Sequence, residues 1–128
     1  EKERLEYYRL VRNVKKVYPI SKEINQAIIE TYEYLQTLPN EKARQKHLKR
    51  VEKGLKEQYT ARMKKLSFTQ GKLLIKLIDR QSNSTSYEAG FYQTFAALFG
   101  ASLKKEYDPL GEDKLTERVV LLVENGQI

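Results

Sequence analysis

The chain has 128 residues, of which 40% are hydrophobic and 32% are charged, a balance typical of a single globular domain. It contains no cysteine, which excludes disulfides, thiolate nucleophiles and cysteine-ligated zinc. The net charge of +7 lies in one segment, because residues 41–66 carry ten Lys or Arg and three Glu, whereas the other 14 basic and 14 acidic residues cancel.

The first two predicted elements are amphipathic helices separated by a proline. Apolar side chains recur at intervals of three and four residues on both sides of Pro19. Because proline disfavours helical geometry in the residue before it, we expect the first helix to end at Tyr18. Ser21 would then cap a second helix that closes at Pro39. The predicted inward residues are Leu5, Tyr8, Val11, Val14 and Tyr18 in the first helix and Ile24, Ile28, Thr31 and Leu35 in the second.

The third predicted helix, capped by Asn40, is long and basic. Its apolar face comprises Leu48, Val51, Leu55, Tyr59, Met63 and Leu66. At about 100° per residue, a row of lysines falls on a separate narrow stripe of the same helix. These candidate anion-binding residues are Lys42, Lys46, Lys49, Lys53, Lys56 and Lys64.

This lysine stripe has two interpretations. A helix over residues 41–66 is roughly 39 Å long at about 1.5 Å per residue, enough to follow several phosphates. Binding to nucleic acid or to an acidic surface would then weaken steeply with salt, because counterions are released. Alternatively, the stripe is the ordinary solvated side of an amphipathic helix, since no arginine-rich patch or stacking aromatic accompanies it.

A fourth segment, residues 70–81, begins after Ser67 or Thr69 and contains an apolar run that suits a buried helix or a buried strand. We expect a helix, because the glycine lies at its start and two basic residues stand four apart. A glycine and lysine at a helix start faintly resemble a phosphate-binding loop, but a P-loop needs two glycines after a strand. In the structural alternative, Lys76 pairs locally, while Asp79 and Arg80 hold a loop at residues 82–86. The candidate motif site comprises Gly71, Lys72, Lys76, Asp79 and Arg80.

The remaining segments also favour helices. A helix lined by Phe91, Phe95, Leu98 and Phe99 should fade at residues 100–103, before a turn at residues 107–111. Residues 113–124 fit a last helix, although residues 119–123 would also suit a strand. Its predicted inward residues are Leu115, Val119, Leu122 and Val123. The fold class expected from these patterns is an all-α compact bundle of five to six helices, forming one domain over residues 1–128.

Few residues indicate catalysis or metal binding. Asp113 and Glu117 share a helix face, with Glu112 beside them, and could hold a hard cation, although acids at a helix start are also expected from the helix dipole. His47 is the single histidine, and no Ser-His-Asp arrangement is indicated around it. We therefore predict no catalytic residues, no metal and no cofactor, with a hydrolase that uses carboxylates brought together by folding as the weaker alternative.

Nine tyrosines without a tryptophan suggest a second kind of contact surface. Tyrosine suits protein interfaces, because it has an apolar ring and a polar tip, although it can equally just reach the surface of the domain. The tyrosines that cannot all be in the core are Tyr7, Tyr8, Tyr32, Tyr34 and Tyr59.

Three parts of the chain resemble one protein family. Its most specific run is Gly-Lys-Leu-Leu-Ile-Lys-Leu-Ile-Asp-Arg at residues 71–80, followed by Thr-Ser-Tyr-Glu at residues 85–88. The other parts are residues 7–14, and Leu-Phe-Gly at residues 98–100 with Tyr107-Asp108. Together they resemble a family of small Bacteroidetes proteins classed only as a domain of unknown function.

The resemblance implies a helical domain without an assigned activity, often behind an export signal. An exported location, in the periplasm or cell envelope, is therefore expected, with a cytoplasmic location as the alternative. Proteins similar to this one carry a longer segment between the equivalents of Glu88 and Ala89. This difference predicts that a loop has been deleted or left out between these two residues.

The function expected from the sequence is a non-catalytic binding or scaffolding domain whose partner is another protein. The alternative is binding of an anionic polymer, nucleic acid or an acidic surface through the basic third helix. No run approaches the roughly 18 apolar residues that a membrane-spanning helix requires.

Overall fold

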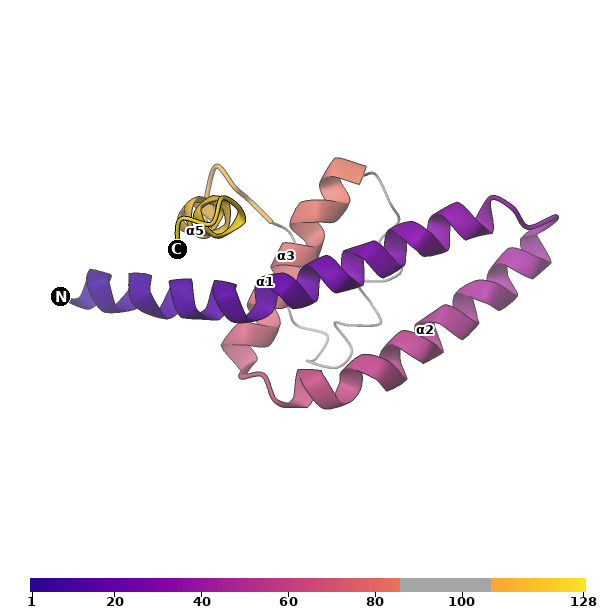
Figure 1. Ribbon diagram of the computed structural model, residues 1–128, viewed down its shortest axis with the longest axis horizontal. Helices are drawn as coiled ribbons and strands as arrows, with labels where there is room; N and C mark the ends of the chain where they lie inside the picture. Colours follow the sequence, from indigo (N-terminus) through magenta and orange to yellow (C-terminus); the bar gives the residue numbers. More distant parts are fainter. Residues whose placement is uncertain (86–106) are drawn as a thin grey trace.

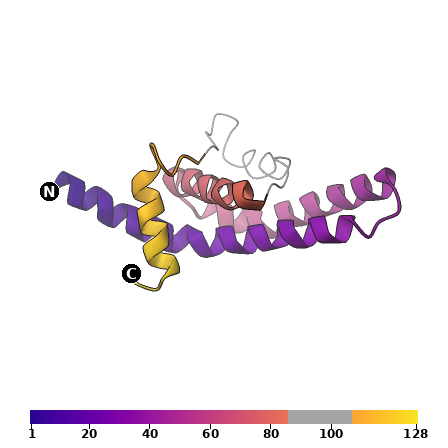
Figure 2. The same ribbon diagram turned by 90° about the horizontal axis from the view of Figure 1, so that it is seen from above.

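The computed structural model describes residues 1–85 and 107–128 (Figure 1). These ranges contain four helices, which are α1 (Lys2–Leu35), α2 (Glu41–Lys64), α3 (Phe68–Thr85) and α5 (Lys114–Glu124). The longest, α1, is the central element: α2 runs back alongside it, α3 crosses it, and α5 lies across its N-terminal half (Figures 1 and 2). The described part of the chain is all-helical, as predicted.

A single helix, α1, replaces the first two predicted helices. It continues through Pro19, and Ser21 does not cap a new helix, because its hydroxyl donates to the carbonyl of Tyr18 at 2.7 Å. Pro19 and Lys15, whose carbonyl loses its helical partner, both lie on the exposed side, where water can replace the missing hydrogen bond. Buried residues on both sides of the proline, including Val17 and Ile24, hold the helix together. The predicted break at Tyr18 is therefore wrong.

The number and order of the helices differ from the prediction as a consequence. Five to six helices were expected, whereas the described residues form four. The long helix with the lysine stripe is the second, α2, with 24 residues, and the third helix, α3, is shorter, with 18. The helix predicted around Phe91–Phe99 and the junction between Glu88 and Ala89 lie outside the described residues.

The start and the inner face of α2 follow the predicted pattern. The side chain of Asn40 accepts a hydrogen bond from the amide of Ala43 at 2.9 Å, which confirms the predicted N-cap. Leu55, Tyr59 and Met63 are buried in the hydrophobic core, and the other members of the predicted face, Leu48, Val51 and Leu66, are partly buried against it. The periodicity therefore identified the correct face of this helix.

The most deeply buried element is α3. It starts with a reciprocal cap, in which the amide of Gln70 donates to the hydroxyl of Ser67 at 3.1 Å and the amide of Ser67 donates to the side chain of Gln70 at 3.0 Å. All of residues 73–78 are buried, which explains the continuous apolar run and confirms a helix rather than a strand. Because α3 continues to Thr85, the loop predicted to begin at Ser82 is wrong.

The last helix, α5, is also confirmed, but its inward face is rotated from the prediction. Val119 and Val120 are fully buried, whereas Leu115 is 43% exposed. A tight turn leads into the helix, in which the carbonyl of Asp108 accepts from the amides of Gly111 and Asp113. A Cβ atom at Gly111 would lie 2.1 Å from a carboxylate oxygen of Asp108, so any larger residue here would displace the Asp108 side chain.

The first turns of α1 extend past α5 (Figure 2). Leu5 and Tyr8, which were predicted to face inward, are 54% and 57% exposed. Among the described helices, none combines the length and the apolar character needed to cross a membrane.

Candidate functional site

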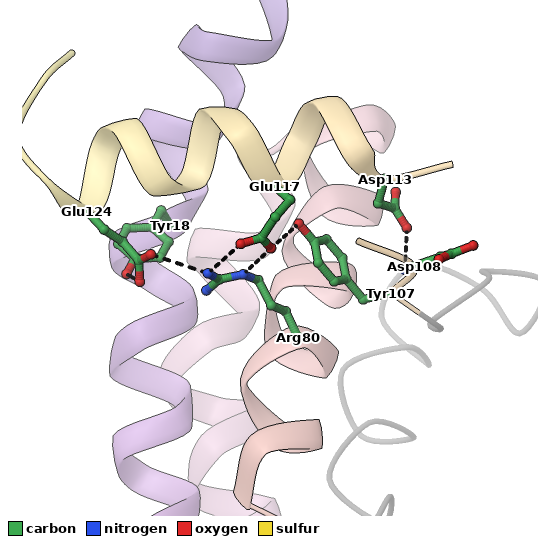
Figure 3. A network of polar contacts seen from close by, with 7 residues as sticks. All are labelled: Tyr18, Arg80, Tyr107, Asp108, Asp113, Glu117 and Glu124. Carbon is green, nitrogen blue, oxygen red and sulfur yellow. Dashed lines mark hydrogen bonds and ion pairs between the residues drawn. The ribbon is translucent and has the colours of Figure 1, made fainter. Parts of the chain in front are cut away.

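A cluster of ion pairs and hydrogen bonds joins α1, α3 and α5 (Figure 3). Arg80 on α3 forms a bidentate pair with Glu117 on α5, with distances of 2.8 Å from Nε to Oε1 and 3.1 Å from Nη2 to Oε2. The same guanidinium also donates to Glu124, the last residue of α5, at 3.2 Å. We call this group, with the two tyrosines described next, the Arg80 cluster. It fastens α5 onto α3.

Two tyrosine hydroxyls complete the Arg80 cluster. Tyr18 on α1 donates to Glu124 at 2.6 Å, and Tyr107 donates to Glu117 at 3.0 Å. Burial, followed by the hydrogen bond to Glu124, raises the pKa of Tyr18 to about 12. Burial and the hydrogen bond to Glu117 likewise raise the pKa of Tyr107 above its ordinary value. Both phenols therefore stay protonated around neutral pH and act as donors.

Arg80 and Glu117 each stabilise the charged form of the other. Hydrogen bonds from Arg80 lower the pKa of the Glu117 carboxyl, and the hydrogen bond to Glu117 raises the pKa of Arg80. The two side chains are only 18% and 23% exposed, so solvent screens their attraction incompletely. Both groups stay charged, and their charges are matched within the cluster.

Lys76, one turn before Arg80 on α3, makes a second link to the C-terminal segment. Its ammonium lies 2.6 Å from Glu112 and 2.7 Å from Asp113. Burial alone would lower the pKa of this lysine, but the hydrogen bonds to Asp113 and Glu112 outweigh that effect and raise it. The local pairing predicted for Lys76 within α3 is wrong, because both partners lie more than 30 residues away in the sequence.

The structure divides the predicted motif site into two parts. Lys76, Asp79 and Arg80 all face the segment that contains Tyr107 and α5, and Asp79 accepts from the backbone amide of Tyr107 at 2.7 Å. Gly71 and Lys72 lie at the other end of α3. The amide of Gly71 donates to the carbonyl of Ser67 at 2.9 Å, so it is not available to hold a phosphate. Lys76, Asp79 and Arg80 thus attach the C-terminal segment to α3.

The acids considered as metal ligands are engaged in the same contacts. Glu112 and Asp113 pair with Lys76, and Glu117 pairs with Arg80. Among the residues that the structure describes, no group of three His, Asp or Glu side chains is placed to hold a metal ion. These acids are therefore engaged in ion pairs with Lys76 and Arg80 of α3.

Most of this network was missed in the sequence, although one signal was available. Lys76 and Arg80 stand four residues apart on α3, and Asp113 and Glu117 stand four apart on the C-terminal segment. Side chains at this spacing share one helix face, so two basic residues match two acidic ones when the helices meet. The hydrogen bond from Tyr18 to Glu124 joins residues 106 positions apart, so no local sequence pattern indicates it.

The lysine stripe on α2 differs from the charged residues of α3 in its exposure and in its ion pairing. All six lysines are exposed, and none of them forms an ion pair with a residue in the described ranges. Two of the three arginines of the same helix do have acidic partners, since Arg44 pairs with Glu41 at 3.2 Å and Arg62 pairs with Glu23 at 2.8 Å. On α2, the positive charges without an ion pair are thus concentrated on the side chains of the stripe.

A groove of about 350 Å³ lies where α1 and α2 meet at the end of their hairpin. In the same pair of helices, the ring of Tyr34 contacts the imidazole of His47 with a centroid distance of 4.5 Å. Tyr34 is 50% exposed, while Tyr59 is in the core, which confirms that the tyrosines are not all internal. The residues lining the groove are Tyr32, Leu35, Gln36, Glu41, Arg44, Gln45 and Leu48.

The comparisons with known proteins identify a family without a function. The model of a domain of unknown function, DUF4294, matches residues 1–122. The chain belongs to this family. No curated protein and no solved structure matches the DUF4294 domain described here. The resemblance to a domain of unknown function is therefore confirmed, whereas the Bacteroidetes source and the exported location stay predictions.

In this DUF4294 domain, replacing Glu117 with glutamine is expected to lower stability at neutral pH, and by progressively less as the pH falls. Arg80 holds the folded pKa of Glu117 below its ordinary value of 4.5. A carboxyl with a depressed folded pKa contributes stability above its unfolded pKa, and this contribution is lost as the pH falls through the folded pKa. Urea unfolding of both proteins, from neutral pH to well below pH 4.5, measures the difference.

The matched control for this pH series is Glu23→Gln, which removes the carboxylate from the exposed pair with Arg62. We expect a smaller loss of stability at neutral pH from this change, because exposed ion pairs contribute little. If Glu117→Gln lowers the free energy of unfolding by the same amount at every pH, the charge of Glu117 does not stabilise the fold.

Proposed function

We propose that this DUF4294 domain is a non-catalytic binding domain that engages an anionic partner through the lysine stripe of α2. The observation that carries the proposal is the contrast between its two groups of charges. Lys76 and Arg80 of α3 are largely shielded from water and pair with acids of the C-terminal segment, whereas the stripe lysines are exposed and make no ion pair with the described residues.

The chemistry of the Arg80 cluster supports a structural role for it. A general acid or base must exchange a proton near the working pH and reach its substrate. The raised pKa values of Tyr18 and Tyr107 move both phenols further from neutral pH, and Arg80 keeps Glu117 ionised. Each of these groups is also hydrogen-bonded to another member of the cluster. The cluster is suited to holding α5 in place.

The charge balance of α2 supports an anionic partner. The helix carries nine Lys or Arg and three Glu, an excess of six positive charges in 24 residues. An ordinary solvated helix face mixes both signs, because paired charges at intervals of three and four residues stabilise it. The stripe lysines instead repel one another, so a polyanion that neutralises them would gain favourable interactions and release counterions.

A protein with an acidic surface is the second candidate partner. It is favoured by the groove at the end of the hairpin, which is lined by Tyr32, Leu35 and Leu48 among other residues. Tyrosine and apolar residues around a shallow groove are typical of protein interfaces. Such a partner would use the N-terminal end of the stripe together with the groove.

Heparin chromatography in a salt gradient tests the proposal. We expect the wild-type domain to be retained and to elute at moderate salt. The variant Lys46→Glu/Lys49→Glu/Lys53→Glu should pass through the column, because it reverses the centre of the stripe. The control Lys15→Glu/Lys72→Glu/Lys114→Glu changes the net charge equally at exposed positions outside α2 and should still be retained.

Two outcomes would contradict the proposal. One is a wild-type domain that is not retained at all. The other is an equal loss of retention in both triple variants, since that result would reflect the net charge of the protein rather than a site. Circular dichroism of each variant establishes that the helices are intact.

A further inference from the structure

We infer that the anionic partner of α2 is the phosphate backbone of a nucleic-acid duplex, bound without base recognition. This inference rests on the proposed function and specifies its ligand. The features that carry it are the linear arrangement of the lysines, the kinds of side chain beside them, and the absence of exposed large apolar residues from α2 in the described structure.

The stripe has the geometry of a straight line of charge. Because α2 is continuous, its six lysines occupy an arc of about 80° on the helix surface, at about 100° per residue. Lys42 to Lys56 place a charge about every 5 Å over about 21 Å, and Lys64 extends the line to about 33 Å. A duplex presents one phosphate charge per ~1.7 Å of its axis when both strands are counted, so a line of this length lies in a dense negative potential from end to end.

The side-chain chemistry indicates contact with phosphates rather than with bases. Base recognition in a groove combines arginine or lysine on guanine with the amides of asparagine and glutamine on adenine, whereas a row made of lysines alone is suited to phosphates, which lysine binds as a point charge. The stripe itself contains only lysines; of the three arginines of α2, Arg44 and Arg62 are paired with glutamates, and the exposed Arg50 lies about 40° outside the stripe. The line therefore provides affinity without a means of reading sequence.

The aromatic residues argue against a single strand as the preferred ligand. Single strands are held by bases stacked on aromatic side chains, in addition to charge. Apart from His47, the aromatic residue of α2 is Tyr59. Its side chain is 3% exposed, so a base cannot stack on it. A single strand also presents half the charge per unit length that a duplex presents, which weakens a purely electrostatic contact.

The distribution of apolar side chains argues against a lipid surface. Helices that lie in a membrane interface insert large apolar residues next to their basic ones. In the described structure, every exposed large hydrophobic side chain lies outside α2, and Leu55, Tyr59 and Met63 point into the core. The stripe can touch an anionic surface but has nothing to insert into it.

Fluorescence anisotropy with a labelled duplex of about 20 base pairs, longer than the stripe, tests the inference. We expect two duplexes of unrelated sequence to bind equally and the matching single strand to bind several-fold more weakly. The logarithm of the binding constant should fall with the logarithm of the salt concentration with a slope of about −5, since about 0.9 counterion is released for each of the six lysine-phosphate contacts.

Neutral substitutions locate the contact without reversing charge. Lys46→Gln/Lys49→Gln/Lys53→Gln should make the salt slope shallower by about 2.7, whereas Lys15→Gln/Lys72→Gln/Lys114→Gln should leave it nearly unchanged. Glu57 is exposed at the edge of the stripe, next to Lys53 and Lys56, and is the acid closest to it. Glu57→Gln should therefore tighten duplex binding, a change that damage to the fold would not produce.

The remaining outcomes separate this inference from the proposed function. Retention on heparin, or sedimentation with vesicles of phosphatidylserine and phosphatidylcholine, combined with no duplex binding, would overturn the duplex assignment and leave anion binding intact. Tighter binding to the single strand than to the duplex would also overturn it. Failure to bind the duplex, heparin and the vesicles would reject both proposals.

Discussion

Replacing Lys76 with alanine is expected to lower the free energy of unfolding by about 3–5 kcal/mol. Lys76 is 8% exposed and Asp113 is 5% exposed, so the pair is shielded from water. Removing the ammonium leaves the Asp113 carboxylate buried, with its charge unbalanced, at a position where it also accepts from the amide of Asp108. Urea unfolding followed by circular dichroism measures the loss.

The control for this prediction is Lys72→Ala. Lys72 lies one turn earlier on α3 and is exposed, so its removal should change the free energy of unfolding by no more than about 0.5 kcal/mol. A similar small effect for Lys76→Ala would mean that the ion pairs with Glu112 and Asp113 do not attach the C-terminal segment to α3.

Replacing Leu74 with alanine is expected to cost about 3 kcal/mol, within the range of about 2–5 kcal/mol found for buried leucines. Leu74 is completely buried in the middle of α3, which crosses α1 at the centre of the core. The substitution removes apolar contacts and leaves a cavity that the surrounding helices fill only in part. The free energy of unfolding in urea again reports the effect.

Leu115→Ala is the matched comparison, because the hydrophobic pattern assigned both leucines to the core. Leu115 is 43% exposed, and we expect its truncation to cost less than about 1 kcal/mol. Equal losses for the two variants would indicate that α5 packs in a different rotation from the one observed.

Features that depend on neighbouring residues were predicted well. The caps at Asn40, which was predicted, and at Ser67, which was one of two alternatives with Thr69, each involve side chains and amides three residues apart, so they are visible in a short stretch of sequence. The inner face of α2 follows from the recurrence of apolar residues at helical intervals. The lysine stripe is predictable for the same reason, because the angular position of a residue on a continuous helix depends only on its number.

Features that depend on distant residues were not predicted. The rule that proline ends a helix failed at Pro19, because the apolar residues on both sides of it are buried by α3 and α5. The exposed positions of Leu5, Tyr8 and Leu115 have the same origin, since an apolar residue is buried only where another element covers it. The pairing of Arg80 with Glu117 and Glu124 requires α5 to lie against α3.

The amino-acid sequence by itself determined the helical class of the described chain, the caps and the line of lysines on α2, since these arise from interactions within a few residues. The tertiary structure decided that two predicted helices are one, that Lys76 and Arg80 serve the C-terminal segment, and that the stripe lysines make no ion pair with the described residues. The physical reason is that burial and charge neutralisation depend on which surfaces meet in the folded chain, and residues far apart in the sequence provide those surfaces.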